Sequence, residues 1–197
     1  MFQNNGTSEV EAGSKEDKKK VMKRIFLIGY MASGKSTLGR AFSEAVGLSF
    51  VDLDGFIEER THRTISELFA VKGEDWFRDL ERKMLHEAAE FENVVISCGG
   101  GTPCFFDNME YMNECGITVF LDVKPERLFE RLKNGRAGRP LLAEKSDEEL
   151  IASIISGLEK RLPYYSKAKL RIDGSRLENK MQISDTVALL KKVINEF

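Results

Sequence analysis

The sequence predicts an α/β fold with three layers, in which helices cover both faces of a five-stranded parallel sheet. Short apolar runs alternate along the chain with segments of helical periodicity, the pattern of strands joined by crossover helices. The expected strands are 24–28, 48–51, 94–97, 117–123 and 170–172. With 197 residues, the chain is long enough for one such domain and short for two. We therefore expect a single domain over residues 21–197.

Composition narrows the possible partners. Charged residues make up 31% of the chain but the net charge is only −2, so no broad basic face for nucleic acid or an anionic membrane is evident. The chain has no apolar leader and no run of about 18 apolar residues that could span a membrane. Its three cysteines form no C-x-x-C pair, which favours a reducing compartment. We expect a cytoplasmic protein with small-molecule partners, and a monomer as the working assumption.

Residues 1–20 are expected to form a disordered extension. They contain Asn, Gly, Ser, Glu and three consecutive lysines but almost nothing apolar, so burial cannot offset the entropy of ordering them. The lysines could contact an anionic surface, although a solvated charge run is the simpler interpretation. Met22 directly precedes the first strand, so the extension could also reflect an upstream start site.

The first strand runs into Gly-Tyr-Met-Ala-Ser-Gly-Lys-Ser at 29–36, which matches the G-x-x-x-x-G-K-[ST] pattern. We call these residues the phosphate loop, because two glycines let successive N–H groups converge on one anion and the following helix directs its positive end there. Lys35 would reach the β- and γ-phosphates, and Ser36 would ligate Mg²⁺. A helix from Ser36 that ends at Gly47 supports this assignment over an ordinary glycine-rich turn.

Two acids follow the second strand. Asp52 and Asp54 stand at its carboxyl end, where open α/β sheets place their ligands. On extended backbone, residues two apart point the same way, so both acids could face the phosphate loop. Alternatively, Asp54 caps the next helix, expected over 55–60.

Two helices are expected between 64 and 90. A capping box at 64–67 starts a short helix that Gly73 ends. The helix over 74–90 then has apolar residues spaced by four, which predicts a buried stripe made of Trp76, Leu80, Met84 and Ala88. Arg78 lies about 200° round the helix from Trp76, off that stripe. Taken alone, Arg78 would form a surface ion pair with Glu81 that stabilises little.

The third strand is followed by three consecutive glycines, Gly99, Gly100 and Gly101, which we call the glycine run. Three glycines in succession are costly in conformational entropy. Their presence is best explained by a backbone that must approach another group closely, although a tight turn is also possible.

After the fourth strand, Pro125 is expected to start a helix that reaches Leu132. The hydrophilic segment 133–146 follows and carries Arg136 and Arg139 among glycines. Such a segment in a phosphate-binding domain predicts a mobile lid that brings cationic charge to a transferring phosphoryl group. A plain surface loop is the alternative.

A second capping box at 146–149 opens the next helix. Pro163 is expected to end this helix and to leave Arg161 and Tyr165 at its margin. The short fifth strand then leads to a last helix with an apolar stripe, made of Ile183, Val187, Leu190 and Ile194.

Taken together, these motifs resemble those of the shikimate kinases over about residues 23–197. Six motifs occur in the family's order: GYMASGKST, FVDLD, FR-x-x-E, GGG, RPLL and R-x-P-x-Y. The resemblance implies a P-loop kinase of the nucleoside-monophosphate-kinase architecture with a mobile lid. It also implies the reaction, transfer of phosphoryl from ATP to the 3-hydroxyl of shikimate in aromatic amino acid biosynthesis.

The resemblance assigns roles residue by residue. It implies three catalytic residues, Lys35, Asp54 and Arg139. It implies an ATP-binding set, Gly29, Ala32, Ser33, Gly34, Lys35, Ser36, Thr37, Arg136 and Arg139. It implies a shikimate-binding set, Asp54, Arg78, Gly99, Gly100, Gly101 and Arg161. Mg²⁺ is assigned to Ser36 and, through water, Asp52. The adenine contact stays open, since both Arg131 and Arg136 lie near the family's position.

Two other functions fit parts of the sequence. Another small-molecule kinase of the same fold, for gluconate or a nucleoside monophosphate, would share the phosphate loop, but Asp54, Arg78, Gly100 and Arg161 favour shikimate. A regulatory nucleotide-binding module without turnover would require a damaged site, whereas Lys35, Ser36, Asp52 and Arg139 are all present.

Overall fold

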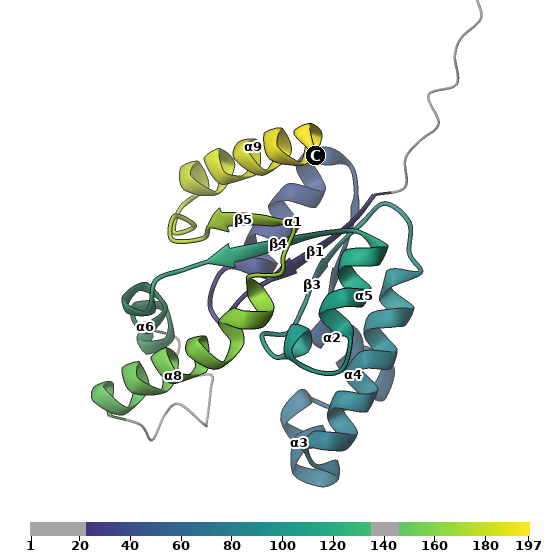
Figure 1. Ribbon diagram of the computed structural model, residues 1–197, viewed down its shortest axis with the longest axis vertical. Coiled ribbons are helices and arrows are strands. Elements are labelled where there is room, and N and C mark those ends of the chain that lie inside the picture. The colour runs from purple at the N-terminus through teal and green to yellow at the C-terminus, as the bar shows by residue number, and fades with distance from the viewer. Residues whose placement is uncertain (1–22, 135–145) are drawn as a thin grey trace, which may run out of the picture.

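The computed structural model describes residues 23–134 and 146–197, and in these ranges a five-stranded sheet forms the centre of the molecule (Figure 1). Its strand order is β2-β3-β1-β4-β5, and every neighbouring pair is parallel. The strands are β1 (Arg24–Ile28), β2 (Ser49–Asp52), β3 (Val94–Ser97), β4 (Ile117–Asp122) and β5 (Leu170–Asp173). The predicted fold class is confirmed.

Helices connect the strands and cover both faces of the sheet. They are α1 (Lys35–Val46), α2 (Leu53–Thr61), α3 (Ile65–Lys72), α4 (Glu74–Ala89), α5 (Asn108–Cys115), α6 (Pro125–Asn134), α8 (Asp147–Tyr165) and α9 (Lys180–Glu196), with a short 3₁₀ turn, η1 (Thr102–Cys104). Helices α1 and α9 lie together on one side, while α2, α4 and α5 cover the other, and α6 packs on α8 (Figure 1).

Strand β1 shows why the sheet is buried on both faces. Its alternate residues Phe26 and Ile28 belong to the apolar cluster beneath α4 and α5, whereas Ile25 and Leu27 belong to the cluster beneath α1 and α9. All four side chains are fully buried. Burial of each contributes about 1.5–3 kcal/mol relative to exposure. A continuous apolar run, in place of an alternating one, is therefore what this strand requires.

Local signals placed several helix ends correctly. Gly47 ends α1 with a positive φ of 70°, and Thr64 and Ser146 start α3 and α8 through complete capping boxes. Helix α5 and the turn η1 were not predicted. Parts of the chain singled out above lie outside the described residues, namely the extension 1–20, most of the expected lid 133–146, and with it Arg136 and Arg139.

The predicted apolar stripe of α4 is right in part. Ala88 is fully buried, and Leu80 and Met84 are partly buried against the core, but Trp76 is 41% exposed. The centre of the buried face is the neighbouring set Phe77, Glu81 and Leu85. Both sets repeat at a spacing of four, so periodicity alone fits either. The sequence favoured Trp76 over Phe77 because the more buried set includes a carboxylate, which is costly to bury without partners.

Helix α8 does not stop at Pro163, contrary to prediction. It continues to Tyr165 with the proline inside its last turn. Proline has no backbone donor, so the helical bond from residue 163 to the carbonyl of residue 159 is absent, and contacts beyond the helix must stabilise the last turn. Because the helix continues, Arg161 and Tyr165 are four residues apart on one helix and share a face.

Close contact between α1 and the sheet makes a prediction for Gly39. A Cβ there would lie 2.5 Å from Cε2 of Phe50 and 3.1 Å from Cδ1 of Leu27. Overpacking costs about 1–3 kcal/mol, against the roughly 1 kcal/mol that alanine gains over glycine in a helix. Gly39→Ala is therefore expected to lower the free energy of unfolding by up to about 2 kcal/mol in urea titrations.

Gly55 in α2 provides the matched control. A Cβ there would meet only the Cβ of Asp52, at 3.9 Å, an ordinary contact. Gly55→Ala should therefore stabilise the protein by up to about 1 kcal/mol. Equal gains from both substitutions would contradict the tight packing of α1 on the sheet.

Candidate active site

The strand order brings three sequence motifs to one edge of the sheet. Strand β1 lies next to β3, and β3 next to β2, so their carboxyl ends are neighbours. The phosphate loop follows β1, Asp52 ends β2, and the glycine run follows β3. Ligands of open parallel sheets bind at this edge.

The phosphate loop has the conformation that its sequence predicts. Ala32 and Gly34 have positive φ angles of 61° and 97°, and the amide of Ser33 donates to the carbonyl of Tyr30 over 3.1 Å. The Ser33 hydroxyl is fully buried and has no hydrogen-bond partner in the described part of the chain. An anion in the loop would give this hydroxyl an acceptor.

Lys35 lies buried inside the loop. Its Nζ donates to the carbonyls of Gly29 and Tyr30, each over 2.9 Å. Burial lowers the pKa of Lys35 to about 8, with the nearby Asp54 opposing that shift most strongly. A polyphosphate at this position would supply a negative counter-charge and so favour the protonated ammonium form of Lys35.

Ser36 and Asp52 meet across the site, as the sequence predicted. The Ser36 hydroxyl donates to Oδ2 of Asp52 over 2.5 Å and lies 3.2 Å from the hydroxyl of Ser97, which pairs with Asp52 in the sheet. Within the described residues, no group of three or more His, Cys, Asp or Glu side chains could hold a metal by itself. One hydroxyl and one carboxylate fit Mg²⁺, because this ion takes oxygen ligands and is commonly held by one or two protein groups together with substrate phosphates.

Asp54 lies on a different element from the one expected. It lies in the first turn of α2, not on extended backbone, and the residue that precedes this helix is Asp52, whose side chain forms no capping bond. The capping role considered for Asp54 is therefore wrong. Lost hydration raises the pKa of Asp54 to about 6; Asp52 and Glu81 add to the shift, and Lys35 opposes it.

The glycine run lies against the side chains that the sequence had singled out. A Cβ on its first residue would lie 3.0 Å from Oδ1 of Asp54, and one on its second residue 3.2 Å from Nη1 of Arg161. On the third residue, a Cβ would lie 2.8 Å from both terminal nitrogens of Arg78. A Cβ on the first glycine would also lie 3.0 Å from Oε1 of Glu81 and from the hydroxyl of Thr102, two groups that bond to each other. The close approach inferred from the three glycines is thus real, and the side chains against the run that face a possible ligand are the carboxyl of Asp54 and the guanidinium groups of Arg78 and Arg161.

Arg78 is not a surface residue, although helix periodicity alone suggested one. Its side chain is only 13% exposed, and its guanidinium group lies 4.1 Å from the ring centroid of Phe105. Nη1 donates to Glu81 over 2.8 Å, while Nη2 and Nε donate to Glu74 over 3.0 and 3.3 Å. Each terminal nitrogen carries a second N–H, which leaves donors for an anionic ligand beside the glycine run.

Glu81 is a buried carboxylate that fixes Arg78. It also accepts a 2.6 Å hydrogen bond from the hydroxyl of Thr102, on the turn after the glycine run. Sequence reasoning paired Glu81 with Arg78 but missed Thr102. A threonine directly after three glycines is too common a feature to signal such a contact.

Arg161 approaches from α8. Its guanidinium carbon lies 4.9 Å from the ring centroid of Tyr30 in the phosphate loop. Tyr165, one turn further on, is fully buried and donates its hydroxyl proton to the carbonyl of Gly100 over 2.5 Å. The continuation of α8 past Pro163 is what makes this second anchor of the glycine run possible.

Arg131 contacts the phosphate loop from outside, through the loop's carbonyl groups. Its Nη1 donates to the carbonyls of Ala32 and Ser33 over 3.1 and 3.2 Å, and Glu178 binds its other side. From the sequence, the base contact is open between Arg131 and Arg136, and nothing points to Glu178. A lone acid in the loop before α9 gave no signal, because its partner is 47 residues away.

The loop has the sequence and the conformation of a phosphate-binding loop, and guanidinium groups lie beside it, which is the arrangement of a P-loop phosphotransferase. Comparison with known proteins agrees. The family model described as shikimate kinase matches residues 31–192. The chain therefore belongs to the shikimate kinase family.

Individual relatives support that assignment. The chain is 62% identical to the shikimate kinase of Phocaeicola vulgatus over 89% of its own length and all of that protein. The crystal structure of shikimate kinase from Bacteroides thetaiotaomicron superposes with a TM-score of 0.86 at 53% identity, covering 88% of this chain and 99% of that one. Shikimate kinase from Acinetobacter baumannii, solved in complex with shikimate, has a TM-score of 0.77 at 30% identity over 89% and 94%.

The lowered pKa of Lys35 makes a prediction for nucleotide binding. Above pH 8 the buried amine is mostly neutral, and the charge of a bound diphosphate favours its protonated form. ADP binding at pH 8.5 should therefore take up a substantial fraction of a proton. Calorimetry in buffers of different ionisation enthalpy measures this uptake, and Lys35→Met should abolish it. Proton release on binding would contradict the assignment.

Proposed function

We propose that this enzyme transfers the γ-phosphoryl group of ATP to the 3-hydroxyl of shikimate, giving ADP and 3-phosphoshikimate. The observation that carries the proposal is the convergence of Asp54, Arg78 and Arg161 on the glycine run, next to the phosphate loop. A carboxyl and two guanidinium groups match an acceptor that has hydroxyls and one carboxylate. The product would serve aromatic amino acid biosynthesis.

The two arginines suit recognition of a small carboxylic acid. A guanidinium group offers parallel donors to a carboxylate, which an ammonium group cannot do. Arg78 is held by Glu81 and Glu74, so its free donors need little further ordering when the acceptor binds. Asp54 would accept hydrogen bonds from the acceptor's hydroxyls.

Phosphoryl transfer needs alignment and neutralisation of charge more than covalent assistance. Asp54 would orient the attacking hydroxyl and accept its proton late in the reaction. Lys35 would leave the loop carbonyls for the phosphates, whose oxygens the amides of the phosphate loop would also bind. Arg139 is proposed to add positive charge from the lid, although it lies outside the described residues.

Several further assignments belong to the same proposal. Ser36 and Asp52 would hold Mg²⁺, which would offset the negative charge of the phosphates. Thr37 and Gly29 would complete the phosphate-binding set.

We also propose a cytoplasmic monomer whose residues 21–197 form one domain. No helix in the described ranges is long and apolar enough to cross a bilayer.

Acceptor specificity is the direct test. Release of ADP should be measured with shikimate, quinate, gluconate and nucleoside monophosphates as acceptors, with Mg²⁺ present. Turnover is expected with shikimate at a kcat/KM at least about 10²-fold above gluconate, because gluconate carries its carboxylate and hydroxyls on a flexible open chain that must be ordered before it can meet the same groups. Turnover with gluconate or a nucleotide and none with shikimate would overturn the proposal.

Arg78 should contribute mainly to acceptor binding. Arg78→Ala is expected to raise the KM for shikimate by about 10²-fold, through loss of a charge-assisted pair worth roughly 2–3 kcal/mol. The dissociation constant of ADP should stay within twofold of the original. Arg82→Ala is the control, since Arg82 is one turn away on α4 and pairs with Asp107 at the surface over 2.7 Å. An equal loss of ADP affinity in a folded Arg78→Ala protein would contradict this division of the site.

The raised pKa of Asp54 predicts an acid limb in the pH profile. Below about pH 6 its carboxyl is increasingly protonated and cannot accept the proton of the acceptor hydroxyl. The kcat/KM for shikimate should fall about tenfold per pH unit on the acid side of that value. Circular dichroism at each pH checks that the protein stays folded. A flat profile down to pH 5 would exclude Asp54 as the base.

A further inference from the structure

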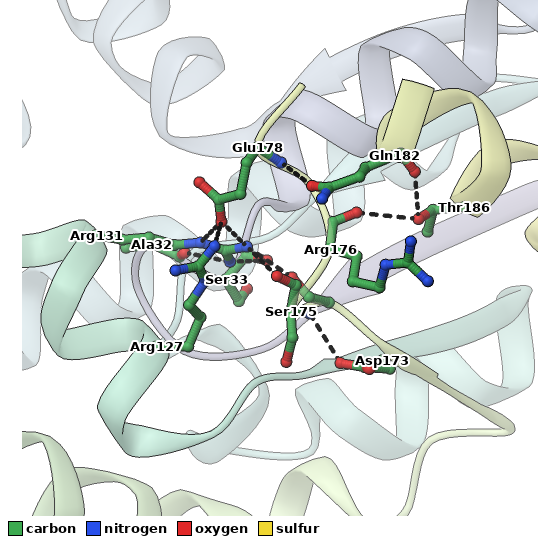
Figure 2. Close-up of polar contacts among 11 residues, drawn as sticks. Ala32, Ser33, Arg127, Arg131, Asp173, Ser175, Arg176, Glu178, Gln182 and Thr186 are labelled. Carbon is green, nitrogen blue, oxygen red and sulfur yellow. Dashed lines mark hydrogen bonds and ion pairs between the residues drawn. The ribbon is translucent and has the colours of Figure 1, made fainter. Parts of the chain in front are cut away.

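The contacts of Arg131 go beyond the proposed reaction. From α6, this residue joins three segments that are distant in the sequence (Figure 2). Besides its bonds to the carbonyls of Ala32 and Ser33, its Nη2 donates to the carbonyls of Gly174 and Ser175, over 2.9 and 3.2 Å. The side chain is only 14% exposed.

Glu178 balances the charge of this buried arginine. Its Oε1 accepts from Nη2 and Nε of Arg131 over 2.8 and 3.0 Å. Glu178 is held in turn by its backbone amide, which donates to the side chain of Gln182 over 3.0 Å on the first turn of α9 (Figure 2). A fixed carboxylate orders the guanidinium group and lowers the cost of its burial.

The position of Arg131 matters because of the conformation of the phosphate loop. Ala32 has a positive φ of 61°, which is unfavourable for a residue with a Cβ and persists only when the surroundings enforce it. In a trans peptide, the carbonyl and the following N–H point in opposite directions. By binding the Ser33 carbonyl from outside, Arg131 turns the amide of Gly34 towards the interior of the loop, where a phosphate would lie.

We infer that Arg131, fixed by Glu178, is a positioning residue that holds the phosphate loop in its anion-binding conformation. Its contribution is therefore to the affinity for any polyphosphate, with or without a nucleoside. The inference rests on the proposed function only in that the loop binds phosphates, and it does not depend on the acceptor. It differs from the base-contacting role weighed for Arg131 from the sequence, which would act on the nucleoside alone.

Inorganic tripolyphosphate separates the two roles because it lacks the base. Dissociation constants of ADP and of tripolyphosphate should be measured by calorimetry or by competition, in Mg²⁺ buffer with the full chain. Arg131→Met keeps the stem and removes the donors, and it should weaken both ligands by the same factor, about tenfold. Arg131→Lys keeps the charge without the forked pair of donors. Its dissociation constants for both ligands should lie between those of the unaltered protein and those of Arg131→Met.

Glu178 and Arg127 provide the second variant and the control. Glu178→Ala should weaken both polyphosphates by several-fold, and Glu178→Gln, which keeps an acceptor, should restore most of the affinity. Arg127 lies 3.2 Å from the same oxygen of Glu178, but in the described part of the chain it has no bond to the phosphate loop. Arg127→Ala should change neither constant by more than twofold.

Three results would overturn the inference. The first is a loss of ADP affinity with tripolyphosphate affinity unchanged, which would assign Arg131 to the base. The second is weakening of shikimate binding by the same factor as ADP, which would indicate general loss of structure. The third is a lack of competition between tripolyphosphate and ATP in the unaltered protein. None of these measurements requires turnover, so failure of the proposed acceptor would be recognised separately.

Discussion

Parallel pairing of β1, β3 and β2 positions both the apolar core and the site. The register opposes Phe26 to Ile96 and Asp52 to Ser97, which sets the three strand ends level. Side chains alternate between faces, so a slip of one residue would exchange the two apolar clusters on either side of the sheet. The same register that buries the core therefore also places the phosphate loop, Asp52 and the glycine run side by side.

Around that edge, charge is stabilised by pairing. Glu81 is almost wholly buried, yet its oxygens accept bonds from Arg78 and Thr102. Arg131 is matched in the same way by Glu178 and by backbone carbonyls. Unpaired charges at such positions would cost several kcal/mol each. The active site is thus a set of charges ordered before any substrate arrives, which lowers the cost of ordering when one binds.

Prediction from the sequence was most successful where a feature is local. The phosphate loop, the capping boxes at Thr64 and Ser146, and the buried strands all depend on residues within a few positions of each other. It failed where a distant partner reverses a local preference. Trp76 was assigned to the core in place of Phe77, since the buried face of α4 contains a carboxylate whose partners lie on other segments. Pro163 was taken as a helix end, although contacts of Tyr165 with the glycine run stabilise the continued turn.

The α/β class, the phosphate loop and, through six ordered motifs, the family can all be inferred from the sequence alone. This is possible because periodicity, glycine placement and motif spacing record short-range requirements of the backbone. Three features are visible only in the folded chain: Asp54 approaches the site from a helix, Arg78 is enclosed, and Arg131 bonds to the carbonyls of the phosphate loop. Those positions depend on contacts between segments tens of residues apart, and the energy of such contacts is defined only once the sheet has brought the segments together.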